Sequence, residues 1–413
     1  MSEPSRSDVA VIGGGPAGLM AADVLSAAGA HVTVYERMPS LGRKFLMAGR
    51  GGLNLTHSEP LDAFLTRFGT EADNLRGPID ALPPDAIRVW CETLGQPTFV
   101  GTSGRVFPKA MKTSPLLRAW LKHLGARGVE VRLRHRWLGY TSGGELTFET
   151  PEGQRARKHD AVVLALGGAS WPGLGGDGKW ASILEAAGVA ITPLTPSNCG
   201  VTVEWSEIFC ARHAGAPLKR IAITLADTRV RGEAILTAAG MEGGGIYALS
   251  PLLRDALAHD GRATITIDLR PDVDIAALTT ALAAPRKKQT LTNFLRKAAQ
   301  LSPAAIGLLQ ESAHASGSSL ASMSPEALAN LAKAVPVVVT GTAGMARAIS
   351  TAGGVEWQAL DANMMLTAHP GTFVAGEMID WDAPTGGYLL QACFSTGAAA
   401  GRGALTWLAE RPS

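Results

Sequence analysis

Residues 8–18 read DVAVIGGGPAG, and this stretch decides the fold. A short apolar run, expected to be a strand, leads directly into the pattern Gly13-x-Gly15-x-x-Gly18. Gly13 permits a tight turn, Gly15 lets the backbone approach a pyrophosphate, and Gly18 lets the next helix pack on the strand. That helix, expected over Leu19–Ala28, would direct its N-terminus at the anion.

A second apolar run over His31–Tyr35 predicts another strand, which ends at Glu36. A carboxylate placed about 20 residues after the glycines accepts hydrogen bonds from a ribose diol. The segment therefore predicts a βαβ dinucleotide site. The alternative is a purely structural glycine turn with a solvent-facing Glu36, which is compatible with the same sequence. Arg37 suits either the 2′-phosphate of NADP or stacking on adenine.

The composition indicates a folded enzyme-sized chain of two or three structural units. Hydrophobic residues make up 46% of the 413 residues and charged residues 18%, which supports a large core. Lys plus Arg total 38 against 36 acidic residues, so the strong basic bias of a nucleic-acid binder is missing. No apolar run is long enough to span a bilayer, so we expect no membrane partner. The four scattered cysteines form no CxxC pair or zinc spacing, which predicts a reducing cytoplasm and no metal site.

The remaining pattern predicts an interrupted α/β domain. A long glycine- and arginine-bearing loop is expected over 37–60, a helix over 114–126 and a strand over 129–138. A buried strand over 160–165 delivers Ala165 and Gly167 to a turn. Short strands, then helices with caps at Ser302 and Ser324, follow further along the chain. We therefore expect a discontinuous α/β domain (1–195 and 340–413), an inserted β domain (196–270 and 336–340) and a helical cap (271–335).

The C-terminal segment favours FAD over NAD as the dinucleotide. A strand in TFVAGEMID (372–380) brings Gly376 and Asp380 to a turn, and GGYLLQ (386–391) opens a helix expected over 392–400. Asp380 suits a ribityl hydroxyl, and the start of the helix suits the N1/C2=O edge of a flavin. An ordinary strand, turn and helix with a surface aspartate is the alternative. No second GxGxxG follows a strand, so a separate NAD(P)H domain is not expected.

Five motifs in a fixed order make a family resemblance specific: GRKFLMAGRGGLNLTHSE (42–59), GRVFP (104–108), ALGGASWPGLGGDG (165–178), GE..D (376–380) and GGYLLQACFSTG (386–397). Nearly the whole chain resembles the bacterial flavoprotein family that includes aminoacetone-oxidase-like and bile-acid-reductase-like proteins. The resemblance implies an α/β fold with a Rossmann-like two-dinucleotide-binding FAD domain that is discontinuous. A β-barrel-like unit and a helical unit would be inserted in it and cover the flavin.

The resemblance also implies contacts for individual residues. The residues that would hold the ADP half are Gly13, Gly15, Ala17 and Glu36, and those near the phosphates or ribose are Arg43 and Lys44. The residues that would line the flavin side are Gly49, Gly51 and Asn54. The backbone of Trp137 would contact adenine, and Asp380 and Leu390 would contact the ribityl chain and flavin. Arg37, Ala165, Gly167, Gly376 and Gly387 complete the expected cofactor set. Many members carry Arg-Cys-Asn where this chain has Gly52-Leu53-Asn54, which indicates a subgroup.

Three residues are candidates for catalysis. Tyr388 suits donation of a proton or hydrogen bond near the flavin, with a packing tyrosine as the alternative. His57 suits a base, with a cap-region histidine as the alternative. Arg105 suits a clamp on a substrate carboxylate, with a loop-tying arginine as the alternative.

The function expected from the sequence is that of an FAD-dependent oxidoreductase, with two-electron transfer at flavin N5 to or from an unidentified small organic substrate. A transiently docking NAD(P)H is the candidate electron donor. The alternatives are an amine oxidase that produces peroxide, a flavin-dependent RNA-modifying enzyme and a non-catalytic flavin carrier.

Overall fold

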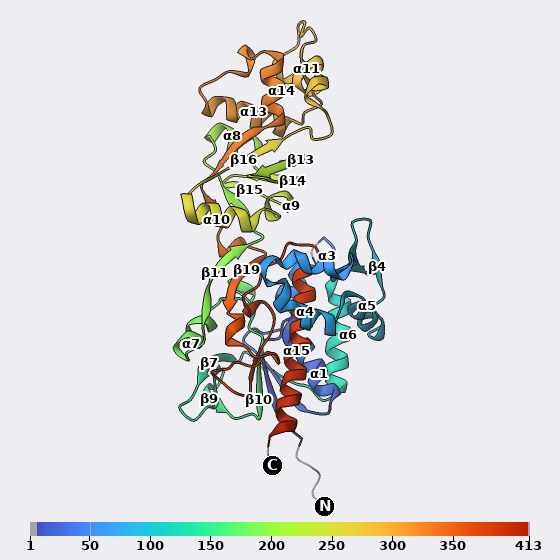
Figure 1. Cartoon of the computed structure of the whole chain (residues 1–413), viewed down its shortest axis with the longest axis vertical. Helices are drawn as coiled ribbons and strands as arrows, with labels where there is room; N and C mark the ends of the chain where they lie inside the picture. Colours follow the sequence, from blue (N-terminus) through green and yellow to red (C-terminus); the bar gives the residue numbers. More distant parts are fainter. Residues whose placement is uncertain (1–5, 50, 412–413) are drawn as a thin grey trace, which may run out of the picture. The chain divides into compact units, whose positions relative to one another are not determined.

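The computed structural model describes residues 6–49 and 51–411 and divides the chain into two compact units. The first unit consists of residues up to Thr195 together with those from Ser350 onward, and the second runs from Pro196 to Ile349 (Figure 1). Each unit has its own cluster of buried hydrophobic side chains. The predicted interruption of an α/β domain by an insertion therefore corresponds to two separate cores.

The first unit is built on a five-stranded sheet in the order β20-β10-β1-β2-β6, and all its pairings are parallel. Parallel strands covered by helices on both faces carry near-continuous apolar runs, and Val9 to Ile12 of the central strand are all buried. The predicted Rossmann-like α/β fold is therefore confirmed. The strands are β1 (Asp8–Ile12), β2 (His31–Glu36), β6 (Glu130–Leu133), β10 (Ala161–Leu164) and β20 (Thr372–Val374).

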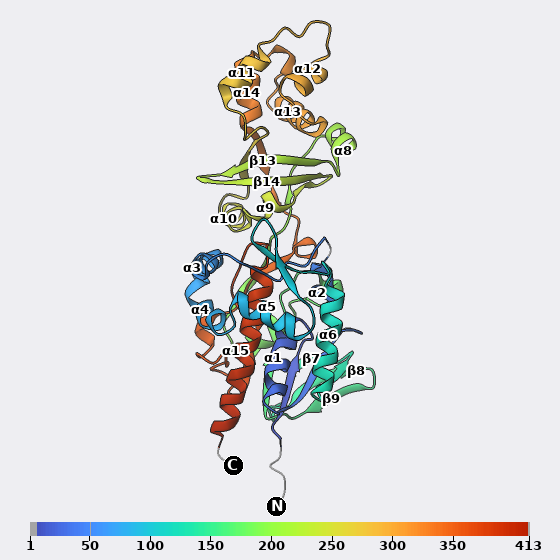
Figure 2. The same ribbon diagram turned by 90° about the vertical axis from the view of Figure 1, so that its right-hand side faces the viewer.

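Two helices, α1 (Pro16–Ala27) and α15 (Tyr388–Glu410), run side by side against this sheet (Figures 1 and 2). Their backbones come so close that a Cβ at Gly397 would lie 2.3 Å from the carbonyl oxygen of Ala17. One turn later, a Cβ at Gly401 would lie 3.1 Å from the carbonyl oxygen of Ala21. These paired contacts run in the same chain direction, so the two helices are parallel and their N-termini point the same way.

Smaller elements complete the first unit. Its helices are α2 (Arg43–Ala48), α3 (Leu61–Leu65), α4 (Ala72–Ala81), α5 (Pro84–Thr93), α6 (Thr113–Ala126) and α7 (Trp180–Ala186). One antiparallel sheet has the order β3-β5-β4, with β3 (Thr56–His57), β5 (Arg105–Pro108) and β4 (Thr98–Val100), and another consists of β7 (Arg136–Tyr140), β8 (Leu146–Thr150) and β9 (Gly153–Arg157). β11 (Ile191–Ser197) pairs with β19 (Ser350–Val355).

The inserted unit has a seven-stranded sheet in the order β17-β16-β13-β14-β15-β12-β18. The two edge strands, β17 and β18, are separated in the chain by Thr340 alone. Consecutive Cα atoms lie about 3.8 Å apart, so the sheet must curl until its edges meet at this corner, which gives it a barrel-like form. The strands are β12 (Val201–Thr202), β13 (Pro217–Leu225), β14 (Thr228–Thr237), β15 (Gly240–Glu242), β16 (Ala263–Asp268), β17 (Val335–Val339) and β18 (Gly341–Thr342).

The helices of the inserted unit share one hydrophobic core with its sheet. They are α8 (Glu207–His213), α9 (Gly244–Tyr247), α10 (Ser250–Asp260), α11 (Ile275–Leu282), α12 (Leu291–Ala298), α13 (Pro303–Ala315) and α14 (Pro325–Lys333). The predicted caps of α13 and α14 are confirmed, since the Ser302 and Ser324 hydroxyls each accept a backbone N–H bond of 3.1 Å. The sequence predicted a separate β domain and helical cap. Because their helices and sheet share one core, residues 196–349 form a single compact unit instead.

The structure differs from the sequence-based boundaries in four places. The strand expected over 129–138 is two strands in different sheets, because Arg134 has a φ of 58° and turns the chain between them. The loop expected over 37–60 contains α2 and β3, and the helix expected over 392–400 extends from Tyr388 to Glu410. Residues 340–349 belong to the inserted unit, because β18 pairs with β12.

Candidate functional site

The glycine turn after β1 requires glycine at two of its positions. Gly13 has a φ of +110°, and a Cβ there would lie 2.2 Å from the carbonyl oxygen of Ala165. A Cβ at Gly18 would lie 2.0 Å from the carbonyl oxygen of Gly13. By contrast, a Cβ at Gly15 would meet no atom within 4 Å. The turn is therefore closely packed on its inner side and open at Gly15.

Helix α1 begins at this opening without a side-chain cap. Gly15 is its N-cap residue, and no described side chain accepts a hydrogen bond there. In the inserted unit, by contrast, α11 to α14 all start with a side-chain oxygen on a backbone N–H. The first amides of a helix are unsatisfied and carry partial positive charge. The start of α1 thus offers N–H donors to an anion.

Glu36 is held firmly at the end of β2. Its two carboxylate oxygens accept hydrogen bonds from the amides of Gly14 (2.9 Å) and Met38 (2.8 Å). Burial raises the pKa of Glu36, while these two amides act in the opposite direction. A carboxylate oxygen has more than one acceptor position, so both oxygens can still accept a bond from a ribose hydroxyl.

Arg37 already has an acidic partner. Its guanidinium lies 2.5 Å from the carboxylate of Asp177 and donates a second bond of 3.2 Å to the carbonyl of Pro172. Asp177 belongs to the glycine-rich 165–178 motif. A 2′-phosphate would have to compete with this carboxylate, so the arrangement favours a cofactor without that group.

Lys44 and Glu377 form the ion pair next to the glycine turn. Lys44 donates to Glu377 (2.8 Å) and to the hydroxyl of Ser170 (2.9 Å). Glu377 also accepts from the amides of Thr351 (2.9 Å) and Gly168 (3.3 Å). Its neighbour Gly376 lies against α1, where a Cβ would come within 2.7 Å of the Cβ of Ala17. A carboxylate is therefore held close to the start of α1.

Asp380 points elsewhere. Hydrogen bonds from the Thr192 side chain and the Gly353 backbone reach its carboxylate, and burial raises its pKa. It thus ties the chain after β20 to β11 and β19. Glu377, shortly after the parallel strand β20, is a second carboxylate at this edge of the sheet. The contact of Asp380 with a ribityl chain stays a prediction.

The loop after α2 contains glycines at positions of close packing or unusual backbone conformation. A Cβ at Gly49 would lie 1.9 Å from the hydroxyl oxygen of Thr113, and Gly51 has a φ of +88° and faces open space. Asn54 Oδ1 and the Thr113 hydroxyl are buried, and neither has a hydrogen-bond partner among the described residues. Arg43, at the start of α2, makes only a long bond of 3.4 Å to Ser40, and its buried Nε also lacks a described partner. Arg50 lies outside the described residues.

The turn after β10 approaches the same edge of the sheet. The amide of Ala165 donates to Ile12 (2.8 Å), which extends the pairing of β10 and β1. Gly167 has a φ of +72°, and its carbonyl accepts a bond of 2.8 Å from the indole of Trp180. Trp137 is buried in β7 of a separate sheet, and its Nε1 has no described partner. Its contact with adenine stays a prediction.

Helix α15 starts as α1 does, at an uncapped glycine. Gly387 is its N-cap residue, has a φ of +109°, and would place a Cβ 2.5 Å from the backbone of Thr56. No side chain among the described residues caps this helix. Leu390, in its first turn, packs half-buried against the core. The residues around both helix starts fit a long dinucleotide: two free N-termini, backbone packing that leaves no room for a Cβ, and the orphaned amide oxygen of Asn54.

Tyr388 and His57 lie against each other but are engaged in structural bonds. The Tyr388 hydroxyl donates a 2.6 Å bond to Glu59, and burial together with Glu59 raises its pKa. His57 stacks on the Tyr388 ring with 5.5 Å between centroids. Its Nδ1 accepts from the Glu59 amide (3.1 Å), so Nε2 carries the proton and donates to the Ser103 carbonyl (2.9 Å). Both side chains are thus hydrogen-bonded within the protein, and their catalytic roles stay predictions.

Arg105 is the most exposed of the three catalytic candidates. It is exposed and lies opposite His57 in the pairing of β3 and β5. Its Nε would be 3.5 Å from a Cβ at Gly386. The structure therefore brings the three predicted catalytic residues together, but it leaves only this guanidinium open to a ligand.

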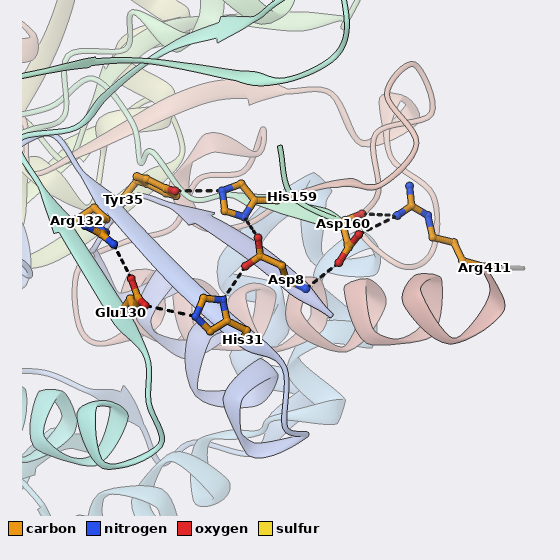
Figure 3. Close-up of polar contacts among 8 residues, drawn as sticks. All are labelled: Asp8, His31, Tyr35, Glu130, Arg132, His159, Asp160 and Arg411. Carbon is orange, nitrogen blue, oxygen red and sulfur yellow. Dashed lines mark hydrogen bonds and ion pairs between the residues drawn. The ribbon is translucent and has the colours of Figure 1, made fainter. Parts of the chain in front are cut away.

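At the amino edge of the parallel sheet, opposite the edge with the glycine turn, polar side chains bind one another. Figure 3 shows Asp8 at the centre of a network there: its carboxylate lies 2.8 Å from a ring nitrogen of both His31 and His159, and its amide donates to Asp160 (2.9 Å). Tyr35 contacts the other nitrogen of His159 (3.1 Å). Across the described ranges, no group of three or more His, Cys, Asp or Glu side chains is arranged to hold a metal ion.

No helix within residues 6–49 and 51–411 has both the length and the apolar character needed to cross a bilayer.

The inserted unit has a hollow of about 480 Å³ of its own. It is lined by Lys219, Arg220, Ile221, Arg231, Gly232, Glu233, Pro271 and Asp272. Arg231 and Asp272 form an ion pair there, so part of its charge is already neutralised.

Comparison with known proteins points to one family. The family described as HI0933-like protein Rossmann domain matches residues 7–403. A 3-dehydro-bile acid delta(4,6)-reductase of Clostridium scindens is 25% identical, over 98% of this chain and 99% of that protein. A ribosomal RNA dihydrouridine synthase of Escherichia coli is also 25% identical, over 95% of this chain and 96% of that protein.

Solved structures show the same fold at lower sequence identity. A 3-ketosteroid-delta4-(5alpha)-dehydrogenase from Rhodococcus jostii has a TM-score of 0.52 at 16% identity, covering 98% of each chain. A 3-ketosteroid delta1-dehydrogenase from Sterolibacterium denitrificans has a TM-score of 0.53 at 13% identity, covering 98% of this chain and 100% of that one. The predicted family resemblance is confirmed.

Proposed function

The chain belongs to the HI0933-like Rossmann-domain family, and from that premise we propose that it is an FAD-dependent oxidoreductase acting on a small organic substrate. The observation that carries the proposal is the parallel pair α1 and α15, which both begin at a glycine without a described side-chain cap. Gly397 lies level with Ala17. Gly397 comes nine positions after the first residue of α15, and Ala17 comes one position after the first residue of α1. At 1.5 Å per residue, α15 therefore starts about 12 Å beyond the start of α1.

Two N-termini at this spacing suit an elongated ligand with an anionic middle and an electron-accepting ring at one end. The amides at the start of α1 would bind the pyrophosphate, and Glu36 would accept the ribose hydroxyls. Glu377, oriented by Lys44, would accept hydroxyls of the ribityl chain. The amides at the start of α15, with Asn54, would bind the polar edge of the ring and stabilise negative charge there.

FAD supplies two-electron transfer at its N5 atom when it is bound. The names of the similar proteins describe reduction of a bile acid and dehydrogenation of ketosteroids. We therefore favour reduction or dehydrogenation of an apolar cyclic compound over oxidation of an amine with release of peroxide. The ion pair between Arg37 and Asp177 argues against a 2′-phosphate, and therefore against NADP, in the glycine turn.

Reduction experiments under anaerobic conditions test this function. Purified protein should carry the absorbance of oxidised flavin, and NADH or NADPH should bleach it while simple amines should not. Bleaching by amines with peroxide formation in air would instead establish the oxidase. A correctly folded protein that binds no flavin would refute the proposal.

A second candidate is a flavin-dependent RNA-modifying enzyme, favoured by the relative in Escherichia coli. The small net charge of +2 argues against it, because phosphate binding normally requires a basic surface. Dihydrouridine formed in ribosomal RNA incubated with the reduced protein would establish this function. A non-catalytic flavin carrier would show no turnover with any pair of electron donor and acceptor.

A further inference from the structure

The three-stranded sheet β3-β5-β4 has one buried face and one open face. Thr56 lies opposite Val106, and both are fully buried. On the other face His57 lies opposite Arg105, and Phe99 lies opposite Phe107. Because side chains alternate along a strand, Arg105 and Phe107 project from the same side, about 7 Å apart.

The aromatic half of this face is exposed. Phe99 and Phe107 stack with 5.6 Å between centroids, and the side chain of Phe99 is 38% exposed. Met111, 40% exposed and with a φ of 56°, lies beside them. A Cβ at Gly52 would lie 2.9 Å from Met111 Cε, and one at Gly101 3.0 Å from Phe107 Cε2. Glycine at both places thus leaves room around the rings.

The cationic half is Arg105. No carboxylate among the described residues lies within ion-pair distance of it. The nearby carboxylate of Glu59 is taken up by Arg67, with bonds of 3.2 and 2.8 Å, and by Tyr388. An exposed guanidinium beside an exposed aromatic pair matches a ligand with an anionic end and an apolar body.

We propose that this face, defined by Phe99, Arg105, Phe107 and Met111, binds the substrate, and that the substrate is a rigid apolar ring compound carrying a carboxylate at one end. Gly52 connects the face to the loop of Asn54, and Gly386 connects Arg105 to the start of α15. Both segments belong to the cofactor site proposed above. The assignment of this ligand as the substrate rests on that proposed function, whereas its binding to the face does not.

The test is calorimetric titration of the full-length protein with 2-naphthoate and with its uncharged isostere 2-naphthamide. Naphthoate should bind about tenfold more tightly, since a hydrogen bond to a charged group is the stronger one. R105Q should remove this difference and leave naphthamide unchanged, while R105K should retain part of it. F99A should weaken both probes equally.

Matched controls are R155Q, at an exposed arginine of β9, and V89A, at an exposed valine of α5. Neither should change the affinity for either probe. Equal affinities for the two probes, or an R105Q protein that still prefers naphthoate, would overturn the proposal. Tighter binding of uridine monophosphate than of naphthoate would also overturn it and would point to a nucleotide ligand.

Flavin content is measured in the same samples, so the two proposals can fail separately. Protein without flavin that still binds naphthoate through Arg105 would leave the binding face in place and refute the oxidoreductase. Protein with flavin whose preference for naphthoate is absent would refute the binding face alone.

Discussion

The two edges of the parallel sheet in the first unit are made from the same five strands but differ in how their polar groups are satisfied. At the amino edge, the carboxylate of Asp8 pairs with His31 and His159, and its amide donates to Asp160 (Figure 3). At the carboxyl edge, α1 starts without a described side-chain cap, and the nearby Asn54 keeps a buried oxygen without a described partner.

We infer that the paired polar groups of the amino edge stabilise the fold, whereas the unpaired groups of the carboxyl edge bind a ligand. A buried polar atom left without a partner costs about 1–3 kcal/mol. Such a cost is tolerated where a bound molecule offsets it, because ligand binding to the native state adds to stability. Substitutions at the carboxyl edge should therefore change cofactor binding, and substitutions at the amino edge should change the stability of the protein alone.

The largest effect is expected for Gly15→Asp. A Cβ at Gly15 meets no atom and its φ of −88° is ordinary, so the fold should persist. The added carboxylate would repel a pyrophosphate at the start of α1, and FAD affinity should fall by about 100-fold or more. Fluorescence titration of the apoprotein with FAD measures it. The control is Gly77→Asp, at an exposed position of α4 where a Cβ also meets no atom, and a similar loss there would contradict the contrast between the edges.

A smaller effect is expected for Glu377→Gln, which removes the charge paired with Lys44 but keeps the shape of the side chain. FAD affinity should fall by about tenfold, because a charged hydrogen bond contributes about 1.5–3 kcal/mol. Asp380→Asn is the matched comparison and should change affinity less, since that carboxylate is directed at Thr192 and Gly353. The reverse order of the two variants would favour Asp380, the residue expected from the sequence, as the ribityl ligand.

At the amino edge, Asp8→Asn should lower the free energy of unfolding by about 1 kcal/mol without changing FAD affinity. The value is small because Asp8 and His31 are both partly exposed and screened by solvent. Chemical denaturation of the apoprotein measures stability, and FAD titration of the same sample measures affinity. A loss of affinity equal to that of Glu377→Gln would mean that the two edges are not independent.

The smallest effect is a dependence of stability on pH through His31. Its hydrogen bond to Asp8 raises its pKa above the ordinary value of 6.5. The contribution is therefore fully present below pH 6.5 and is lost as the pH rises through the higher folded value. Burial lowers the pKa of His159, which acts in the opposite direction as the pH falls below 6.5.

His31→Asn should therefore lose a few tenths of a kcal/mol of stability in acid relative to the parent and little in alkali. Denaturation curves on both sides of pH 6.5 give the difference. An equal loss at both pH values would show that packing, and not charge, is what His31 contributes.

Much of the site could be predicted because its requirements are local. The glycines at 13, 15 and 18 follow one strand and start one helix, so their backbone geometry is determined within a single turn of chain. The C-terminal glycines pointed to a second helix start in the same way. The pairing of Glu377 with Lys44 could not be predicted, because the two residues lie more than 300 positions apart in the chain.

The sequence by itself determined the family, the interrupted α/β fold and the helix start after the glycine turn, since each depends on consecutive residues. Only the tertiary structure decided that Tyr388 and His57 are held by Glu59 while Arg105 is open, and that residues 340–349 belong to the inserted sheet. It also placed Phe99 beside Phe107 on an exposed face. These outcomes depend on pairings between distant segments, whose partners no short stretch of sequence specifies.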